Sequence, residues 1–169
     1  TSTVLREQVI ASTSQIATAF RQTASALSEV ASGIASDASV QTDRLNGDLT
    51  ALHRVNISLL RAADGTNNRA TLLDERDRLL DSISAALPIR VSYGEHGEAV
   101  ASAEAPGNPV LLDASGAANV VMAQASDGRI SFSLATTGLP LIAASGSLNG
   151  IATASAHVDD QRTALDSFA

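Results

Sequence analysis

Apolar residues recur at helical spacing from about residue 3 to residue 61. One column repeats every seven residues: Ile10, Ala17, Ala24, Ala31, Ala38, Leu45, Leu52 and Leu59. A second column starts three positions later: Thr13, Phe20, Leu27, Ile34, Gln41, Asp48, Val55 and Ala62. Two such columns form a narrow seam suited to lengthwise packing against other helices. The pattern predicts one long helix over residues 1–63, and Gly33 or Gly47 is the position where a kink could form in it.

A cluster of turn-forming residues follows this helix and separates it from a second one, so that residues 64–87 are predicted as a turn plus a helix. The turn is Asp64 to Asn68, and Asn68 or Thr71 is expected to cap the new helix. Its apolar stripe consists of Leu72, Leu73, Leu79, Leu80, Ile83 and Leu87. Asp74 and Arg78 are four residues apart and are expected to pair. Pro88 ends the helix, because proline disfavours a helical conformation in the residue before it.

The hydrophobic period changes to two over residues 88–145, which predicts an excursion of short antiparallel strands. The strongest hairpin signal is Asp127-Gly128, flanked by alternating segments over 119–125 and 129–135. Further strands are expected at 89–93, 99–103 and 108–112, and a last one at 139–143, giving one sheet of five or six strands. From residue 146 to 169 the spacing is helical again: Leu148, Ile151, Ala152, Ser155, Val158, Arg162, Leu165 and Phe168.

This order of elements predicts an α+β fold. Long antiparallel helices pack as a rod-like bundle, and a small antiparallel β-sheet is inserted between them. About 60 helical residues at ~1.5 Å each extend roughly 90 Å, which is too long for a compact chain of 169 residues. We therefore expect a single rod-like domain that belongs to a longer protein.

Composition and charge exclude several classes of function. There is no Cys, so disulfides, thiolate metal sites and cysteine nucleophiles are excluded. The net charge of −7 argues against nucleic acid as a partner, and no apolar run is long enough to span a membrane. Residues 91–169 contain two Arg and eight acidic residues, so most of the negative charge lies there. We expect that region to face solvent.

The most concentrated set of charged residues is Asp74, Arg76 and Asp77 at the start of the second helix. Such a set can bind an ion or take part in acid–base chemistry, but it can equally cap the helix and form salt bridges. The second interpretation is favoured because nothing nearby indicates a catalytic pocket. Arg76 is the residue expected to anchor the turn, since its planar guanidinium can bind backbone carbonyls and a carboxylate together. The three His are isolated, so the sequence predicts no metal, no cofactor and no enzyme.

Two segments resemble the flagellar hook-associated protein 1 family. The stretch from Asn67 to Leu80, with Leu72-Leu73-Asp74 followed by Arg76-Asp77, is similar to that family's Asn-Asp-Leu-Leu-Asp-Gln-Arg-Asp-Gln-Leu pattern. The stretch from Ser145 to Ile151 resembles its Gly-x-Leu-Gly-Gly turn into a helix. The residues that carry the resemblance are Leu72, Leu73, Asp74, Arg76, Asp77, Gly146, Leu148 and Gly150.

The resemblance implies a structural protein of the bacterial flagellum that forms the junction ring between hook and filament. It implies export through the flagellar type III system without a cleaved signal, and an extracellular location. The implied partners are further copies in the ring, the hook protein, a neighbouring junction protein or the filament, and an export chaperone. The seam is then expected to serve helix packing or a subunit interface through Ile10, Phe20, Leu27, Ile34, Leu45, Leu52 and Leu59.

Two alternatives remain open from the sequence. Another flagellin-like axial protein, such as flagellin or the second junction protein, would share the long helices but lack the Leu-Leu-Asp-x-Arg-Asp helix before the sheet. A receptor-type signalling coiled coil would show heptads without a β excursion, and the Asp127-Gly128 hairpin signal speaks against it.

Overall fold

The computed structural model describes residues 2–168 and contains, within that range, three helices and six short strands. In chain order they are α1 (Ser2–Leu59), α2 (Asn67–Ala86), β1 (Ile89–Tyr93), β2 (Ala99–Ala103), β3 (Val110–Asp113), β4 (Gly116–Ala117), β5 (Val120–Gln124), β6 (Ile130–Leu134) and α3 (Ser147–Asp166). The long helix, the second helix, the strands and the returning helix follow one another in the predicted order. The arrangement confirms the α+β fold class.

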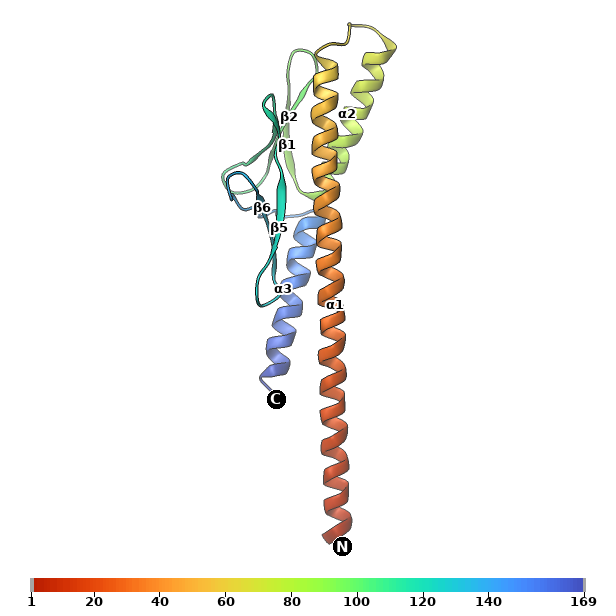
Figure 1. Cartoon of the computed structure of the whole chain (residues 1–169), viewed down its shortest axis with the longest axis vertical. Helices are drawn as coiled ribbons and strands as arrows, with labels where there is room; N and C mark the ends of the chain where they lie inside the picture. The colour runs from red at the N-terminus through yellow and green to blue at the C-terminus, as the bar shows by residue number, and fades with distance from the viewer. Residues whose placement is uncertain (1, 169) are drawn as a thin grey trace.

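The helix α1 is the rod of the molecule and runs its full length (Figure 1). Its many Ser and Thr residues are accommodated because their hydroxyls donate to the carbonyl four residues earlier, as Thr42 does to Ala38 at 2.7 Å. The helix continues through Gly33 and Gly47 without interruption, and Figure 1 shows no sharp bend along α1. Glycine permits a bend at such a position, but only packing or a broken hydrogen bond forces one.

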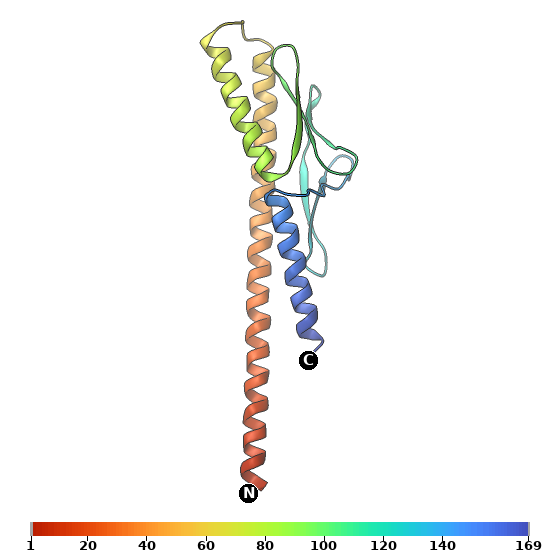
Figure 2. The same ribbon diagram turned by 180° about the vertical axis from the view of Figure 1, so that it is seen from behind.

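The helices α2 and α3 pack end to end along α1, as Figures 1 and 2 show from opposite sides. Both run antiparallel to α1, and α3 begins where α2 ends. All six strands lie in the segment of the chain that connects the end of α2 to the start of α3. The core lies where these elements meet, and its largest fully buried side chains are Leu45, Leu49, Leu52, Leu59, Leu79, Ile83, Leu87, Leu111, Leu112, Leu148 and Val120.

The β region forms two sheets rather than the single sheet that the sequence predicts. Strands β1 to β4 form an antiparallel sheet in chain order, and β5 and β6 form a separate two-stranded ribbon. The strand β4 was not predicted, because two residues are too few to show an alternation of apolar and polar positions. The strand expected at 139–143 is wrong: that segment makes one isolated bridge, between Ser133 and Pro140, and proline has no N–H to extend a ladder.

The start of α2 also differs from the expectation. The N-cap residue is Thr66, whose hydroxyl accepts from the Arg69 backbone N–H at 3.3 Å, so Asn68 and Thr71 lie inside the helix. Arg78 pairs with Glu75 three residues earlier rather than with Asp74. The helix ends as predicted, because Leu87 adopts an extended conformation (φ −154°, ψ 150°) before Pro88.

The seam of α1 is buried in its C-terminal half and exposed near its N-terminus. Leu45, Leu52 and Leu59 are at most 1% exposed, and Leu27 and Ile34 are partly buried, but Ile10 is 65% exposed. A straight α-helix rotates a heptad column by about 20° per repeat. Five heptads separate Ile10 from Leu45, so Ile10 lies about 100° around the helix from it.

Within the described range, no helix has the length and apolar character needed to cross a membrane.

Candidate functional site

The residues that attach the β region to the helices form the most specific set of contacts in the molecule. They lie at three places: the turn between β1 and β2, the buried side of α1, and the start of α3. The sequence motif of α2 belongs to the first place. Leu72 and Leu73 are partly buried and pack against the core, whereas Asp74 is exposed.

Arg76 joins α2 to the turn between β1 and β2. Its Nη1 donates to the Gly97 carbonyl at 2.6 Å, and its Nε and Nη2 donate to Asp77 Oδ1 at 2.8 and 2.6 Å. The guanidinium carbon lies 4.4 Å from the centre of the Tyr93 ring, within range of a cation–π interaction. The side chain is only 13% exposed. One guanidinium therefore contacts a carbonyl, a carboxylate and an aromatic face at once, as its fork geometry allows.

Arg69 makes a second connection at the same end of the rod, and sequence reasoning missed it. Its Nη1 donates to the carbonyls of Leu59 and Ala62, each at 3.4 Å, and its Nη2 donates to the His96 carbonyl at 2.9 Å. Asp64 lies 3.3 Å from its Nε. The last turn of α1 leaves backbone carbonyls without helical partners, and Arg69 bonds two of the carbonyls in this region while also holding the β1–β2 turn.

Two asparagines of α1 bind strands through paired hydrogen bonds. Asn56 donates through Nδ2 to the Ala99 carbonyl at 2.7 Å and accepts from the Ala99 N–H at 2.9 Å. Asn46 makes the same two bonds with Val120, each at 2.8 Å. Each amide thus satisfies both backbone groups of one strand residue, which otherwise would be left without partners beside the helix. Each asparagine fixes the position of one sheet along α1, Asn56 for β2 and Asn46 for β5.

The sequence contained a weak signal for these asparagines. Asn56 is buried at 7% exposure, on the side of a helix that also carries the apolar seam. A polar residue at such a position must find a partner, because an unsatisfied buried amide is costly. Sequence alone did not show which backbone segment would supply that partner.

The start of α3 is fitted closely against the end of α2. Gly146 is the N-cap residue and has φ 89° and ψ 173°, a region accessible essentially to glycine alone. A Cβ added to it would lie 2.5 Å from the Ala86 carbonyl oxygen. Leu148 is 1% exposed in the core, while Gly150 has open space around its Cα. Of the residues in this second motif, Gly146 and Leu148 carry the close packing.

Further along α3, two contacts hold the β5–β6 ribbon. The Ser155 hydroxyl accepts from the Ile130 N–H at 2.9 Å. Arg129 donates to Asp159 and Asp160, each at 2.8 Å. The hydrogen bond with Asp159 raises the pKa of Arg129. The ribbon is thereby attached to α1 through Asn46 and to α3 through Ser155 and Arg129.

The other titratable groups with shifted pKa values take part in turns or exposed ion pairs. Hydrogen bonding from Arg78 lowers the pKa of Glu75, and hydrogen bonding from Ser115 lowers the pKa of Asp113. Among residues 2–168, no group of three or more His, Asp or Glu side chains is placed to hold a metal ion. Asp74 and Asp77 are both exposed, and Asp77 accepts hydrogen bonds from Arg76.

These attachments give a rod, a β region fixed along one side of it, and two motif segments at the points of attachment. The chain matches the family described as flagellar hook-associated protein FlgK helical domain, over residues 1–169. No curated protein matches the chain. Because the match extends over the whole sequence, the chain belongs to the family of the helical domain of FlgK, a flagellar hook-associated structural protein.

Proposed function

We propose that this chain is the rod-like part of a subunit that forms the ring joining the flagellar hook to the filament. The observation that carries the proposal is the match to the hook-associated family over residues 1–169. The attachment of the β region by side chain–backbone bonds at several levels supports it. A subunit that transmits torque between two rod-like assemblies needs its parts held at fixed positions, and multiple attachments along one helix provide that.

The remaining parts of the proposal follow from the same assignment. Subunits associate side by side in the ring and contact the hook protein on one side and a further junction protein or the filament on the other. The full-length protein leaves the cell through the flagellar export channel and assembles outside it, with a chaperone before export. The acidic β region faces solvent, consistent with the net charge of residues 91–169.

The two alternatives from the sequence are less well supported. A signalling coiled coil predicts heptads without strands, whereas six strands lie between α2 and α3. Flagellin or the second junction protein is disfavoured because the family that matches is the hook-associated FlgK family.

Deletion of the full-length gene tests the junction role. We expect cells that still assemble hooks but release filament protein into the medium, as seen by electron microscopy and by immunoblotting of the culture supernatant. Re-expression of the gene should restore attached filaments. Cells that keep normal attached filaments after the deletion would refute the assignment.

A further inference from the structure

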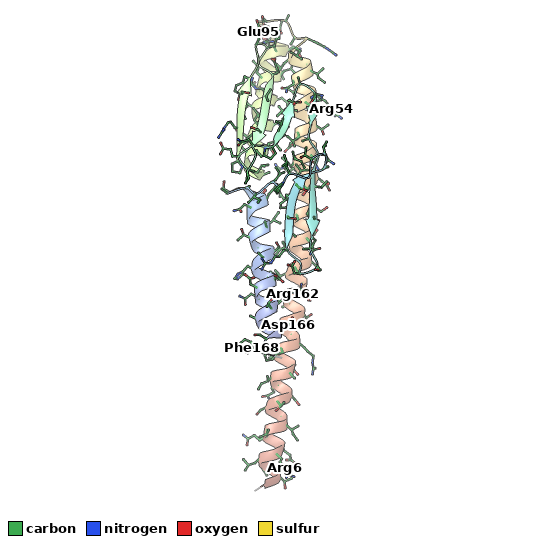
Figure 3. The ribbon with its side chains drawn as sticks, turned by 90° about the vertical axis from the view of Figure 1, so that its left-hand side faces the viewer. Arg6, Arg54, Glu95, Arg162, Asp166 and Phe168 are labelled. Atoms are coloured by element: carbon green, nitrogen blue, oxygen red, sulfur yellow. The ribbon has the colours of Figure 1, made fainter. Side chains whose placement is uncertain are left out.

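Two arginines near the end of α1, Arg54 and Arg61, lie on the side of the helix that faces away from the strands. Arg54 precedes Asn56, which binds β2, by two residues, and Arg61 follows it by five. At about 100° per residue they lie about 160° and 140° around α1 from Asn56. Both are exposed, and Figure 3 shows Arg54 at the outer side of α1.

The charges of Arg54 and Arg61 are not neutralised within the described part of the chain. The ion pairs among residues 2–168 are formed by other arginines: Arg44, Arg69, Arg76, Arg78, Arg90 and Arg129. This side of α1 therefore presents two exposed guanidinium groups that are available to a partner.

The outer face of α2 carries the opposite charge. Asp81 precedes the fully buried Ile83 by two residues and Asp74 precedes it by nine, so they lie about 160° and 180° around α2 from it. Both aspartates are exposed. The acidic partners in the ion pairs made by the arginines of α2 are Asp64, Asp77 and Glu75. Among the described residues, Asp74 and Asp81 therefore remain outside these ion pairs.

Arg54 and Asp74 stand at the same level of the rod. Ser82 of α2 contacts both Arg44 and Asp48 of α1, so it lies level with the point midway between them. Asp74 is eight residues before Ser82, and Arg54 is eight residues beyond that midpoint on the antiparallel helix. Because the rise per residue is the same in both helices, the two charges are level.

A ring of copies that all point in the same direction requires this match in level, because rotation about the ring axis does not change height. Such a ring is built from a heterologous contact, in which one face of a copy binds a different face of the next. We propose that the Arg54 side of α1 in one copy packs against the outer face of α2 in the next, with Arg54 paired to Asp74. The inference rests on the proposed function, since it requires that copies stand side by side in a ring.

The other charged residues of the two faces are compatible with this contact. By the same register, Arg61 is level with Asn67 of the next copy, and Arg78 of α2 is level with Thr50 of α1. Neither arginine therefore meets a like charge at its own level. Arg78 is also paired with Glu75 of its own helix. The contact brings opposite charges together without an opposing repulsion, which favours one partner face over others.

Small and apolar residues lie below the proposed ion pair. Asp81 is level with Gly47, where an added Cβ would have nothing within 4 Å, so the backbone of α1 can be approached closely there. Val40 is 60% exposed and lies two heptads below Arg54 on the same side, within one turn of the level of Ala85. The ion pair sets the level of the two copies, and Val40 supplies apolar surface to bury.

The β region stays clear of this contact. The helix α1 binds β2 through Asn56 on the side away from Arg54, and Asp74 and Asp81 lie opposite the buried residues of α2. Copies joined in this way carry their β regions on one side of the ring wall. This placement agrees with the proposed exposure of the acidic β region to solvent.

Cross-linking in assembled flagella tests the pairing. The full-length protein carrying Arg54→Cys and Asp74→Cys is produced in the deletion strain, and flagella that remain attached are treated with bismaleimidoethane. A bismaleimide is used because the Cα atoms of an ion-paired Arg and Asp are further apart than a disulfide spans. Immunoblotting should show a ladder of dimers, trimers and larger species. Each single variant should give monomers only, which also controls for cysteines elsewhere in the full-length protein, since residues 1–169 contain none.

The matched control is Arg54→Cys with Asp81→Cys, which keeps the same face of α2 but lowers the second cysteine by about 10 Å. It should give a weaker ladder. A stronger ladder from this variant would show that neighbouring copies are staggered and would overturn the level pairing. Dimers from either single variant would indicate a two-fold contact and contradict the heterologous one.

The outcomes also separate this inference from the junction role. If the variants restore attached filaments but the Arg54→Cys/Asp74→Cys protein yields monomers only, the contact between α1 and α2 is wrong and the junction role stands. If the deletion strain itself keeps its filaments attached, the junction role fails and this inference fails with it.

Discussion

The helix α1 contains two regions with similar seams and opposite surroundings. Between Ala38 and Leu59 the seam is covered by α2, α3 and the sheets, and Leu49 and Leu52 have no exposed surface. Between residues 4 and 16 the large apolar residues are more than half exposed, such as Val9 at 64%. The helix itself is the same in both regions. The difference teaches that the seam specifies a packing surface, while the length of the returning helices decides how much of it this chain covers.

Truncating one seam residue in each region should give the largest difference in the free energy of unfolding. Leu52→Ala leaves a cavity in the core and should lower the free energy of unfolding by roughly 2–5 kcal/mol. Ile16→Ala removes a side chain that is 58% exposed and should change it by no more than about 0.5 kcal/mol. Urea denaturation of the two variants and the parent chain measures both losses. Equal losses would contradict the division of α1 into covered and uncovered regions.

Glycine substitutions test the close packing of the start of α3 against the end of α2. This contact lets the two helices together cover one side of α1. Gly146→Ala places a Cβ 2.5 Å from a backbone oxygen at a positive φ, and should cost about 3 kcal/mol. Gly150→Ala, four residues later in open space within the helix, should instead stabilise the chain by about 0.5–1 kcal/mol. Thermal melting of both variants is the measurement. A harmless Gly146→Ala would show that the end-to-end contact is looser than described.

Substitution of Asn56 and of Asn46 measures how strongly each sheet is attached to α1. Asn56→Ala leaves the Ala99 N–H and carbonyl without partners in a buried place, and should cost about 2 kcal/mol. Asn46→Ala breaks two hydrogen bonds to Val120 that are only partly buried, so the loss should be nearer 1 kcal/mol. Amide hydrogen exchange at Ala99 and Val120 reports each site separately. Faster exchange at the same strand residue in both variants would contradict the separate roles.

The smallest effect is expected at the β1–β2 turn. Arg76→Ala removes the bond to the Gly97 carbonyl and the contact with Tyr93, and should cost about 1–2 kcal/mol. Arg78→Ala removes only an exposed ion pair with Glu75 and should have a smaller effect that added salt diminishes further. The melting temperatures of both variants at low and high salt provide the test. If Arg76→Ala melts like the parent chain, Arg76 does not anchor the turn.

Much of the fold could be predicted because its signals are local and repeated. The helical period over some 60 residues, the change to a period of two after Pro88 and the hairpin at Asp127-Gly128 each depend on neighbouring residues only. The errors have equally physical causes. Separation into two sheets, the absent strand near Pro140 and the capping role of Thr66 depend on which hydrogen-bond partners are in reach, and that is a property of the assembled chain.

For the attachment residues, too, local signals could be recognised in the sequence and distant partners could not. Arg76 could be singled out because it lies in a recognisable motif, but its carbonyl partner is Gly97, 21 residues away. Asn56 and Asn46 were missed because their partners lie 43 and 74 residues away. A lone asparagine in a helix gives no indication of such a partner.

By itself the sequence determined the helices, their order, the β excursion and the family. Periodicity and short motifs depend only on residues that are close together in the chain. Only the tertiary structure decided that α2 and α3 meet end to end along α1, and that asparagine and arginine side chains hold the strands in register. It also decided where the cover of α1 stops. These features depend on distances between residues far apart in the chain, which the folded backbone sets.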